Sequence, residues 1–244
     1  MAGHSKWANI KHRKGRQDAK KAKIYTKIGK EIIIAVKQGG NDPDINARLK
    51  AVIQKARANN MPMDNITRTI QKAAGELEGV NYEEFAYEGY GPGGAAVMLD
   101  IMTDNRNRTA GEVRHLFSKF GGNLGESGCV AWMFDKKGLI IIDKEDLKTD
   151  PDDILMIALE AGAEDMNDEG DSIEVTCIPE EFDTVESALR EAGLPVTVAE
   201  ISMIPQNTVA LEGNEAEKML KLMDALEDHD DVQNVYSNFD IADE

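Results

Sequence analysis

The sequence predicts an α+β multidomain protein, in which an N-terminal three-helix domain is followed by two small α/β domains of the ferredoxin-like kind, one inserted in the other. Two patterns lead to this prediction. Apolar residues recur with the helical period over residues 18–75, and strand and helix patterns then alternate along the remainder. A length of 244 residues fits two or three domains, and an apolar content of 41% is typical of a globular chain. The composition therefore excludes collagen-like, disulfide-scaffold and disordered proteins.

The first 78 residues are predicted to form a basic helical domain. A helix is expected over residues 18–38, with Asp18 as its N-cap and a glycine pair at 39–40 as its end. The apolar residues of this helix that share one face are Ile24, Ile28, Ile32 and Ala35. Two further helices follow the turn at 41–43 and Pro62, and their apolar faces comprise Leu49, Val52, Ile53 and Ala56, then Ile66, Ile70 and Ala73.

The pattern changes after Gly79 to short strands and helices. A strand is expected at 95–101, a helix at 109–120, and a hairpin from strands at 130–134 and 139–142 around a four-residue turn at 135–138. The next unit consists of a helix at 153–161, a strand at 172–177, a helix at 180–192 and a strand at 196–203. The last consists of a strand at 208–211, a helix at 215–226 and a strand at 232–239.

Pro205 follows a complete α/β unit, so the final segment is free to return to the preceding one and complete its sheet. This places the domain boundaries at 1–78 for the helical domain, at 79–130 together with 206–244 for the middle domain, and at 131–205 for the inserted domain.

Charge is distributed very unevenly along the chain. The formal net charge is −17, yet the first 74 residues hold 17 Lys and Arg against 5 Asp and Glu, which leaves 11 basic and 40 acidic residues for the remainder. A basic segment beside an acidic body indicates a nucleic-acid or membrane arm. The alternative is that the two parts neutralise each other within the molecule or in an oligomer.

The basic residues are arranged so that they fit a nucleic-acid backbone. Cations crowd the first 16 residues, and lysines then follow one stripe of the first predicted helix, where they would neutralise successive phosphates. A solvated lysine face is the alternative, and Trp7 is either a packing anchor or a platform for an unpaired base. The predicted contacts are Lys6, Trp7, Lys11, His12, Arg13, Lys14, Arg16, Lys20, Lys23, Lys27 and Lys30.

A second candidate for phosphate binding is the polar segment 103–109, between a strand and a helix. Asn107 or Thr109 is expected to cap the helix, and Arg106 and Arg108 are suited to bidentate phosphate contacts. The alternative is an ordinary capping loop in which Arg106 pairs with Asp100 or Asp104.

Other motifs give no support for an enzyme. Residues 89–94 match GxGxxG, but a strand follows where a dinucleotide site needs a helix. Cys129 and Cys177 have no metal-type spacing and fit a reducing compartment. The acidic clusters lack calcium-loop order, and the longest apolar run is far too short for a membrane helix. We therefore expect no catalytic residues, cofactor, metal, membrane segment or small-molecule substrate.

Several longer motifs, taken together, resemble the YebC family over essentially the whole chain. They lie at residues 2–7, 12–14, 87–94, 104–109, 112–115 and 202–205. The resemblance implies a cytosolic three-domain protein without enzymatic activity or cofactor. Some members of that family are described as DNA-binding transcriptional regulators, and others as factors that act at the ribosome on proline-rich stretches. The start of the chain, without a leader before Gly3, favours the bacterial cytosolic form.

The expected function is therefore that of a non-enzymatic nucleic-acid-binding regulator of gene expression in the cytoplasm. A ribosome-bound translation factor is the alternative, so the expected partner is duplex DNA or ribosomal RNA, with the ribosome as a further candidate. The sequence has no obvious recognition helix and few neutral polar side chains beside the lysines, which favours recognition of the backbone or of structured RNA. The oligomeric state is not indicated.

Overall fold

The computed structural model describes residues 21–75, 81–145, 147 and 149–241. The first part is a helical unit made of α2 (Lys21–Gly39), α3 (Ala47–Ala58) and α4 (Met63–Ala74). Its core contains the apolar faces expected from the sequence, with Ile28, Ile32, Leu49 and Ile66 fully buried. The Asn46 side chain accepts from the Leu49 amide and donates to the Ala35 carbonyl, which joins the start of α3 to the end of α2. The three predicted helices are confirmed.

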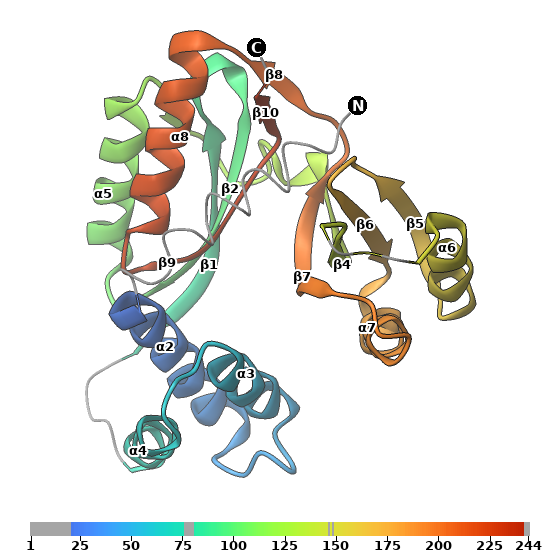
Figure 1. The fold of residues 1–244 in the computed structure, drawn as a ribbon. Coiled ribbons are helices and arrows are strands. Elements are labelled where there is room, and N and C mark those ends of the chain that lie inside the picture. Colours follow the sequence, from blue (N-terminus) through green and yellow to red (C-terminus); the bar gives the residue numbers. More distant parts are fainter. Residues whose placement is uncertain (1–20, 76–80, 146, 148, 242–244) are drawn as a thin grey trace.

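A four-stranded antiparallel sheet follows, with strand order β3-β1-β2-β9. Its strands are β1 (Glu83–Tyr90), β2 (Ala96–Thr103), β3 (Asn123–Leu124) and β9 (Val232–Ser237). Figure 1 shows α5 (Arg106–Lys119) and α8 (Gly213–Glu227) side by side on one face of this sheet. Apolar side chains from β2, α5, α8 and β9 form the core between them.

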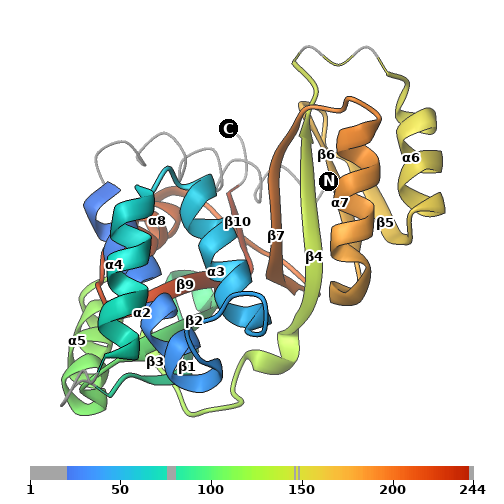
Figure 2. The same ribbon diagram turned by 90° about the horizontal axis from the view of Figure 1, so that it is seen from below.

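The second sheet also has four strands, in the order β5-β6-β4-β7. They are β4 (Phe134–Asp143), β5 (Ala163–Asp168), β6 (Ser172–Cys177) and β7 (Val196–Pro205). Two helices, α6 (Pro151–Glu160) and α7 (Phe182–Glu191), cover one face, as Figure 2 shows. The α+β fold class is confirmed, and no helix within the described ranges is long and apolar enough to cross a membrane.

The hairpin expected over residues 130–142 is wrong. Residues 134–143 form one continuous strand, which pairs along nearly its whole length with β7. Gly138 lies within this strand. A larger residue would not fit there, because a Cβ would stand 2.6 Å from the Cys177 sulfur and 2.8 Å from the Phe182 ring. The glycine therefore permits a close approach between layers and does not mark a turn.

Other differences lie at strand ends and in polar strands. The strand expected at 232–239 is divided at Asn238, whose side chain accepts from the Ala96 amide, and β10 (Phe239–Ile241) pairs instead with β8 (Val209–Leu211). The sequence analysis did not predict β1, β3 or β5. Strand β1 contains three glutamates and a glycine, and β5 contains three acidic residues, which obscure the strand pattern.

The domain boundaries remain a proposal. We propose 1–78, 79–130 with 206–244, and 131–205, because β9 returns to pair with β2 after the second sheet is complete. The three largest apolar clusters, in the helical unit and behind each of the two sheets, support this division.

Candidate nucleic-acid interface

The structure describes only part of the predicted nucleic-acid contacts. Lys6, Trp7, Lys11, His12, Arg13, Lys14, Arg16 and Lys20 lie outside the described residues, as does the expected N-cap Asp18. The remaining predicted contacts are Lys23, Lys27 and Lys30 on α2 and Arg106 and Arg108 at the start of α5.

Lys23, Lys27 and Lys30, here named the lysine row, point toward the C-terminal end of α8. Figure 1 shows this end of α8 directly beside α2. Their Nζ atoms donate to three main-chain carbonyls, at 2.9 Å from Lys23 to Asp228, 2.7 Å from Lys27 to Glu227 and 2.8 Å from Lys30 to Asp230. The last carbonyls of a helix have no partner within the helix and carry partial negative charge, so the lysine row stabilises the end of α8.

Side-chain exposure decreases along the lysine row from Lys23 to Lys30. The side chain of Lys23 is 45% exposed, whereas that of Lys30 is only 10% exposed. This differs from the prediction of a stripe of lysines that all face an external polyanion. The helical period correctly placed the lysines on one face, but that face meets the acidic end of α8, about 200 residues later in the chain.

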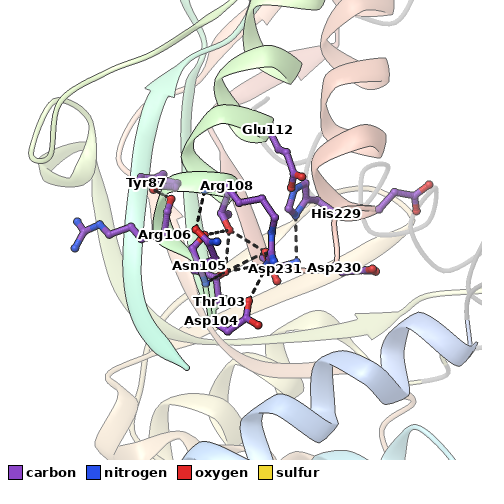
Figure 3. Close-up of polar contacts among 12 residues, drawn as sticks. Tyr87, Thr103, Asp104, Asn105, Arg106, Arg108, Glu112, His229, Asp230 and Asp231 are labelled. Atoms are coloured by element: carbon purple, nitrogen blue, oxygen red, sulfur yellow. Dashed lines mark hydrogen bonds and ion pairs between the residues drawn. The ribbon is translucent and has the colours of Figure 1, made fainter. Parts of the chain in front are cut away.

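Lys30 ends in a buried ionic cluster centred on Asp231. Its Nζ lies 2.6 Å from Asp231 Oδ1, while Arg108 donates to Asp231 Oδ2 at 2.8 Å. The hydroxyls of Thr103 and Thr109 lie 3.1 and 2.8 Å from the same Oδ2 atom. Figure 3 shows how side chains from β2, the start of α5 and the segment before β9 converge on this carboxylate. We name these five residues the Asp231 cluster.

The Asp231 carboxylate is held in its ionised form. Burial by itself would raise its pKa, but hydrogen bonds from Lys30, Arg108 and Thr109 outweigh burial and hold the pKa well below the ordinary range of aspartate. A single negative charge thus connects the helical unit to the first sheet. The structure therefore assigns Lys30 and Arg108 to an internal ion-pair network.

The start of α5 differs in detail from the prediction. Asn105 is the N-cap, and its side chain accepts from the Arg108 amide, whereas Asn107 or Thr109 was expected in that role. Thr109 is instead buried in the Asp231 cluster. The aspartate that pairs within this loop, Asp104, contacts Arg108 and not Arg106.

Both arginines are exposed, and Arg106 is the one that lies outside the Asp231 cluster. Its guanidinium lies 4.4 Å from the centre of the Phe85 ring, and Figure 3 shows the side chain directed away from the Asp231 cluster. Within the described residues it has no ion-pair partner. Arg106 is therefore available to an external anion, while Arg108 is engaged internally.

The sequence analysis did not identify the partner of the lysine row. This partner is the acidic loop, residues 227–231, which reads Glu-Asp-His-Asp-Asp directly after the helix predicted at 215–226. A run of acids at a helix C-terminus is unfavourable unless cations lie nearby, so this run was a signal for a basic partner.

One group of residues in this region resembles a metal site. Potential ligand atoms of Glu112, His229 and Asp231 lie within 4.8 Å of one another. His229 Nε2 is 2.9 Å from Glu112, and its Nδ1 accepts from the Asp231 amide. Because Lys30 and Arg108 already neutralise Asp231, an added cation would meet two positive charges, and we interpret the group as part of the ionic network.

The glycine-rich motif at 89–94 connects β1 to β2 by a short 3-10 turn, Pro92–Gly94, and β2 follows. The turn packs closely on α8, since a Cβ on Gly91 would stand 2.6 Å from the Met219 sulfur. The motif therefore provides a close approach between the β1–β2 turn and α8.

A second buried carboxylate fixes the connection into β4. Glu88 on β1 accepts from the amides of Gly128, Val130 and Ala131 at 2.7 to 2.8 Å. Burial tends to raise its pKa, but these three hydrogen bonds prevail and lower it. One side chain thus holds the segment through which the chain passes from the first sheet to the second.

Replacement of Glu88 with glutamine is expected to destabilise the protein by about 2 kcal/mol, because the amide NH₂ would face at least one main-chain donor. Urea unfolding measures the effect. Glu126→Gln, an exposed change nearby, is the control and should alter stability by less than about 0.5 kcal/mol. Equal effects of the two substitutions would contradict the role assigned to Glu88.

Comparison with known proteins identifies the family. Residues 5–76 match the model of the TACO1/YebC protein N-terminal domain, and residues 82–239 match the model of the TACO1/YebC second and third domain. The crystal structure of Aq1575, a conserved hypothetical protein of Aquifex aeolicus, is similar with a TM-score of 0.79 and 45% sequence identity, and the match covers 93% of each chain.

Relatives match over their full length. A probable transcriptional regulatory protein of Natranaerobius thermophilus is 59% identical over 244 residues, which cover 100% of this chain and 98% of the relative. A protein of Pelotomaculum thermopropionicum with the same name is 58% identical over 243 residues, which cover 100% of each. The resemblance expected from the motifs is thereby confirmed, and the chain belongs to the TACO1/YebC family.

Proposed function

We propose that this protein is a non-enzymatic regulator of gene expression that binds nucleic acid in the cytoplasm through its basic N-terminal domain. The observation that carries the proposal is the excess of 17 basic over 5 acidic residues in the first 74, beside a strongly acidic remainder. The names of the relatives, probable transcriptional regulatory proteins, support a regulatory role.

Exposed cations on α3 and α4 add to the surface available for phosphate. Lys50 and Arg57 are seven residues apart on α3, and Arg68 and Lys72 are four apart on α4, so each pair shares one helix face. All four side chains are exposed, and none forms an ion pair within the described residues. They extend the positive surface of the helical unit beyond the lysine row.

We therefore propose three groups of nucleic-acid contacts. The first comprises the N-terminal residues Lys6, Trp7, Lys11, His12, Arg13, Lys14, Arg16 and Lys20. The second comprises Lys50, Arg57, Arg68 and Lys72 on α3 and α4, and the third is Arg106 at the start of α5. Lys23 and Lys27 join them once the acidic loop releases them, whereas Lys30 and Arg108 are assigned to the Asp231 cluster.

A charge-neutralised variant tests the proposal. Arg57→Gln with Arg68→Gln should weaken binding of short duplex DNA or RNA about tenfold, at about 0.7 kcal/mol for each lost phosphate contact. The slope of log affinity against log salt should fall by about two. Fluorescence anisotropy of the labelled nucleic acid measures both quantities.

The matched control removes the same charge from the acidic part of the molecule. Lys218→Gln with Lys221→Gln changes two exposed lysines of α8 and should leave affinity and slope nearly unchanged. An equal loss in both variants would indicate a general charge effect, and no loss in either would contradict the proposed surface. Crosslinking in cells, followed by sequencing of bound DNA and of bound RNA, then identifies the polymer. Recovery of ribosomal RNA would assign the protein to translation.

A further inference from the structure

We propose that the contact between the lysine row and the acidic loop is autoinhibitory: Lys23 and Lys27 become available to a nucleic-acid backbone only when the acidic loop releases them. The inference rests on the proposed function, and it assigns a regulatory contact to the same surface. It follows from what the three lysines bind in the closed structure.

The acidic loop occupies the atoms that a phosphate would need. Lys23 and Lys27 donate from Nζ to main-chain carbonyls at the end of α8, and Lys23 Nζ is also 3.9 Å from the Asp228 carboxylate. Carbonyl oxygens at a helix C-terminus, together with carboxylates, form a negatively charged surface. An ammonium group has three donors, so a phosphate oxygen does not have to displace these carbonyls, but the negatively charged surface beside each Nζ repels it. The internal contact and a bound polyanion therefore oppose each other.

The two ends of the lysine row differ in how firmly they are held. Lys30 is buried and forms an ion pair with Asp231, whose other oxygen binds Arg108 and the two threonines. Lys23 is nearly half exposed, and its contacts with Asp228 are of a kind that contributes little to stability in water. Lys30 therefore acts as the fixed point, whereas the Lys23 end is able to open without loss of the Asp231 cluster.

Solvent reaches the contact through a groove of about 550 Å³ between α2 and the acidic loop. Lys23, Thr26 and Lys30 line it from α2, and Asp228, Asp230 and Asp231 line it from the other side. Lys23 is the most exposed of the three lysines, so an anion that approaches α2 reaches it before Lys27 and Lys30. Binding there favours the open arrangement, and by linkage any change that opens the contact must raise the affinity for the anion by the same factor.

Hydrogen exchange reports the opening directly. The amides of Asp228, His229 and Val232 are bonded to main-chain oxygens, and that of Asp231 is bonded to the His229 ring. Exchange at the amides of Asp228 and His229 in the full chain should become faster when short duplex DNA of arbitrary sequence, or an RNA of the same length, is added, whereas the amides of Asp231 and Val232 should keep their rates because the Asp231 cluster stays intact. Unchanged or slower exchange at Asp228 and His229 in the bound protein would overturn the proposal.

A variant of the acidic loop tests the competition. Asp228→Asn with Asp230→Asn should tighten binding of the same DNA or RNA about fivefold, because less opening has to accompany binding. The variant should also exchange faster at the amides of Asp228 and His229 without nucleic acid. Asp183→Asn with Glu217→Gln is the control, since it removes two exposed acids elsewhere, on α7 and α8.

The outcomes separate this inference from the function on which it rests. If the control and the loop variant gain nucleic-acid affinity equally, and amide exchange in the loop is unchanged, the effect is one of net charge. This result would overturn the autoinhibitory contact but not the proposed function. Failure of the wild-type protein to bind either DNA or RNA at low salt would overturn the proposed function, and the autoinhibitory contact with it.

Discussion

Replacement of Asp231 with asparagine is expected to destabilise the protein by about 3 to 5 kcal/mol. The substitution leaves the Lys30 ammonium buried without its counter-ion and removes the charge that binds Arg108. A buried ion pair contributes little when both partners are compared with apolar residues, but loss of one partner leaves an uncompensated charge. Urea unfolding of the full chain, followed by circular dichroism, measures the change.

Two further variants show whether the loss belongs to the ion pair. Lys30→Met combined with Asp231→Asn should be more stable than the sum of the single changes predicts, with a coupling energy above about 1 kcal/mol. Glu217→Gln, which breaks an exposed pair with Lys221 on α8, should cost less than about 0.5 kcal/mol. Additive effects of the two changes at the buried pair would contradict the assigned contact.

The same cluster gives the protein a specific response to acid. Because the pKa of Asp231 is lower in the folded protein than in the unfolded chain, its contribution is fully present above the unfolded value of about 3.9. The contribution is lost as the pH falls toward the lower folded value. Unfolding free energy measured from neutral pH down to about pH 2 should therefore fall less steeply in Asp231→Asn than in the wild type.

Much of the helical unit was predictable because its signal is local. Ile28 and Ile32 recur at the helical period and are buried, and the glycine pair after Val36 ends α2 close to the expected residue. Strand β6 was expected at 172–177 and has those bounds, since alternation and turn residues mark both of its ends. The local periodicity and the residues that end each element were sufficient to predict α2 and β6.

The remaining differences come from contacts between segments distant in sequence. Gly138 follows two lysines and an aspartate, which together are typical of a turn, and only the packing of Cys177 and Phe182 explains why a glycine stands within a long strand. The polar strands β1 and β5 are stabilised by pairing with apolar neighbours. Neither effect is visible in the local pattern.

The partner of the lysine row also lies far from it in the sequence. Spacing placed Lys23, Lys27 and Lys30 on one helix face, but it did not reveal that the acidic loop faces them. The alternative that basic and acidic parts neutralise each other within the molecule applies to this row, where Lys30 binds Asp231. The excess positive charge is available to a partner at Lys50, Arg57, Arg68 and Lys72 on α3 and α4, which are exposed.

Binding of nucleic acid is expected to weaken by about three orders of magnitude when the salt concentration rises from about 50 to 200 mM, if about six phosphates are contacted. Each contact releases a condensed counter-ion, so log affinity falls linearly with log salt. The acidic loop adds a second expectation, for the affinity and the salt slope of its variant. If Lys23 and Lys27 join only after release from the loop, the Asp228→Asn with Asp230→Asn variant should bind more tightly while it keeps nearly the same slope, because the same phosphates are contacted in the end.

Anisotropy titrations over this range, with duplex DNA and with RNA, measure both the slope and its dependence on the variants. Arg106→Gln should reduce the slope by about one, since this arginine is exposed and has no internal ion-pair partner in the described part of the chain. Arg114→Gln, an exposed arginine further along α5, is the matched control and should leave the slope unchanged. A flat salt response in the wild-type protein would mean that few phosphates are neutralised, and the excess of cations in the first 74 residues would then need another partner.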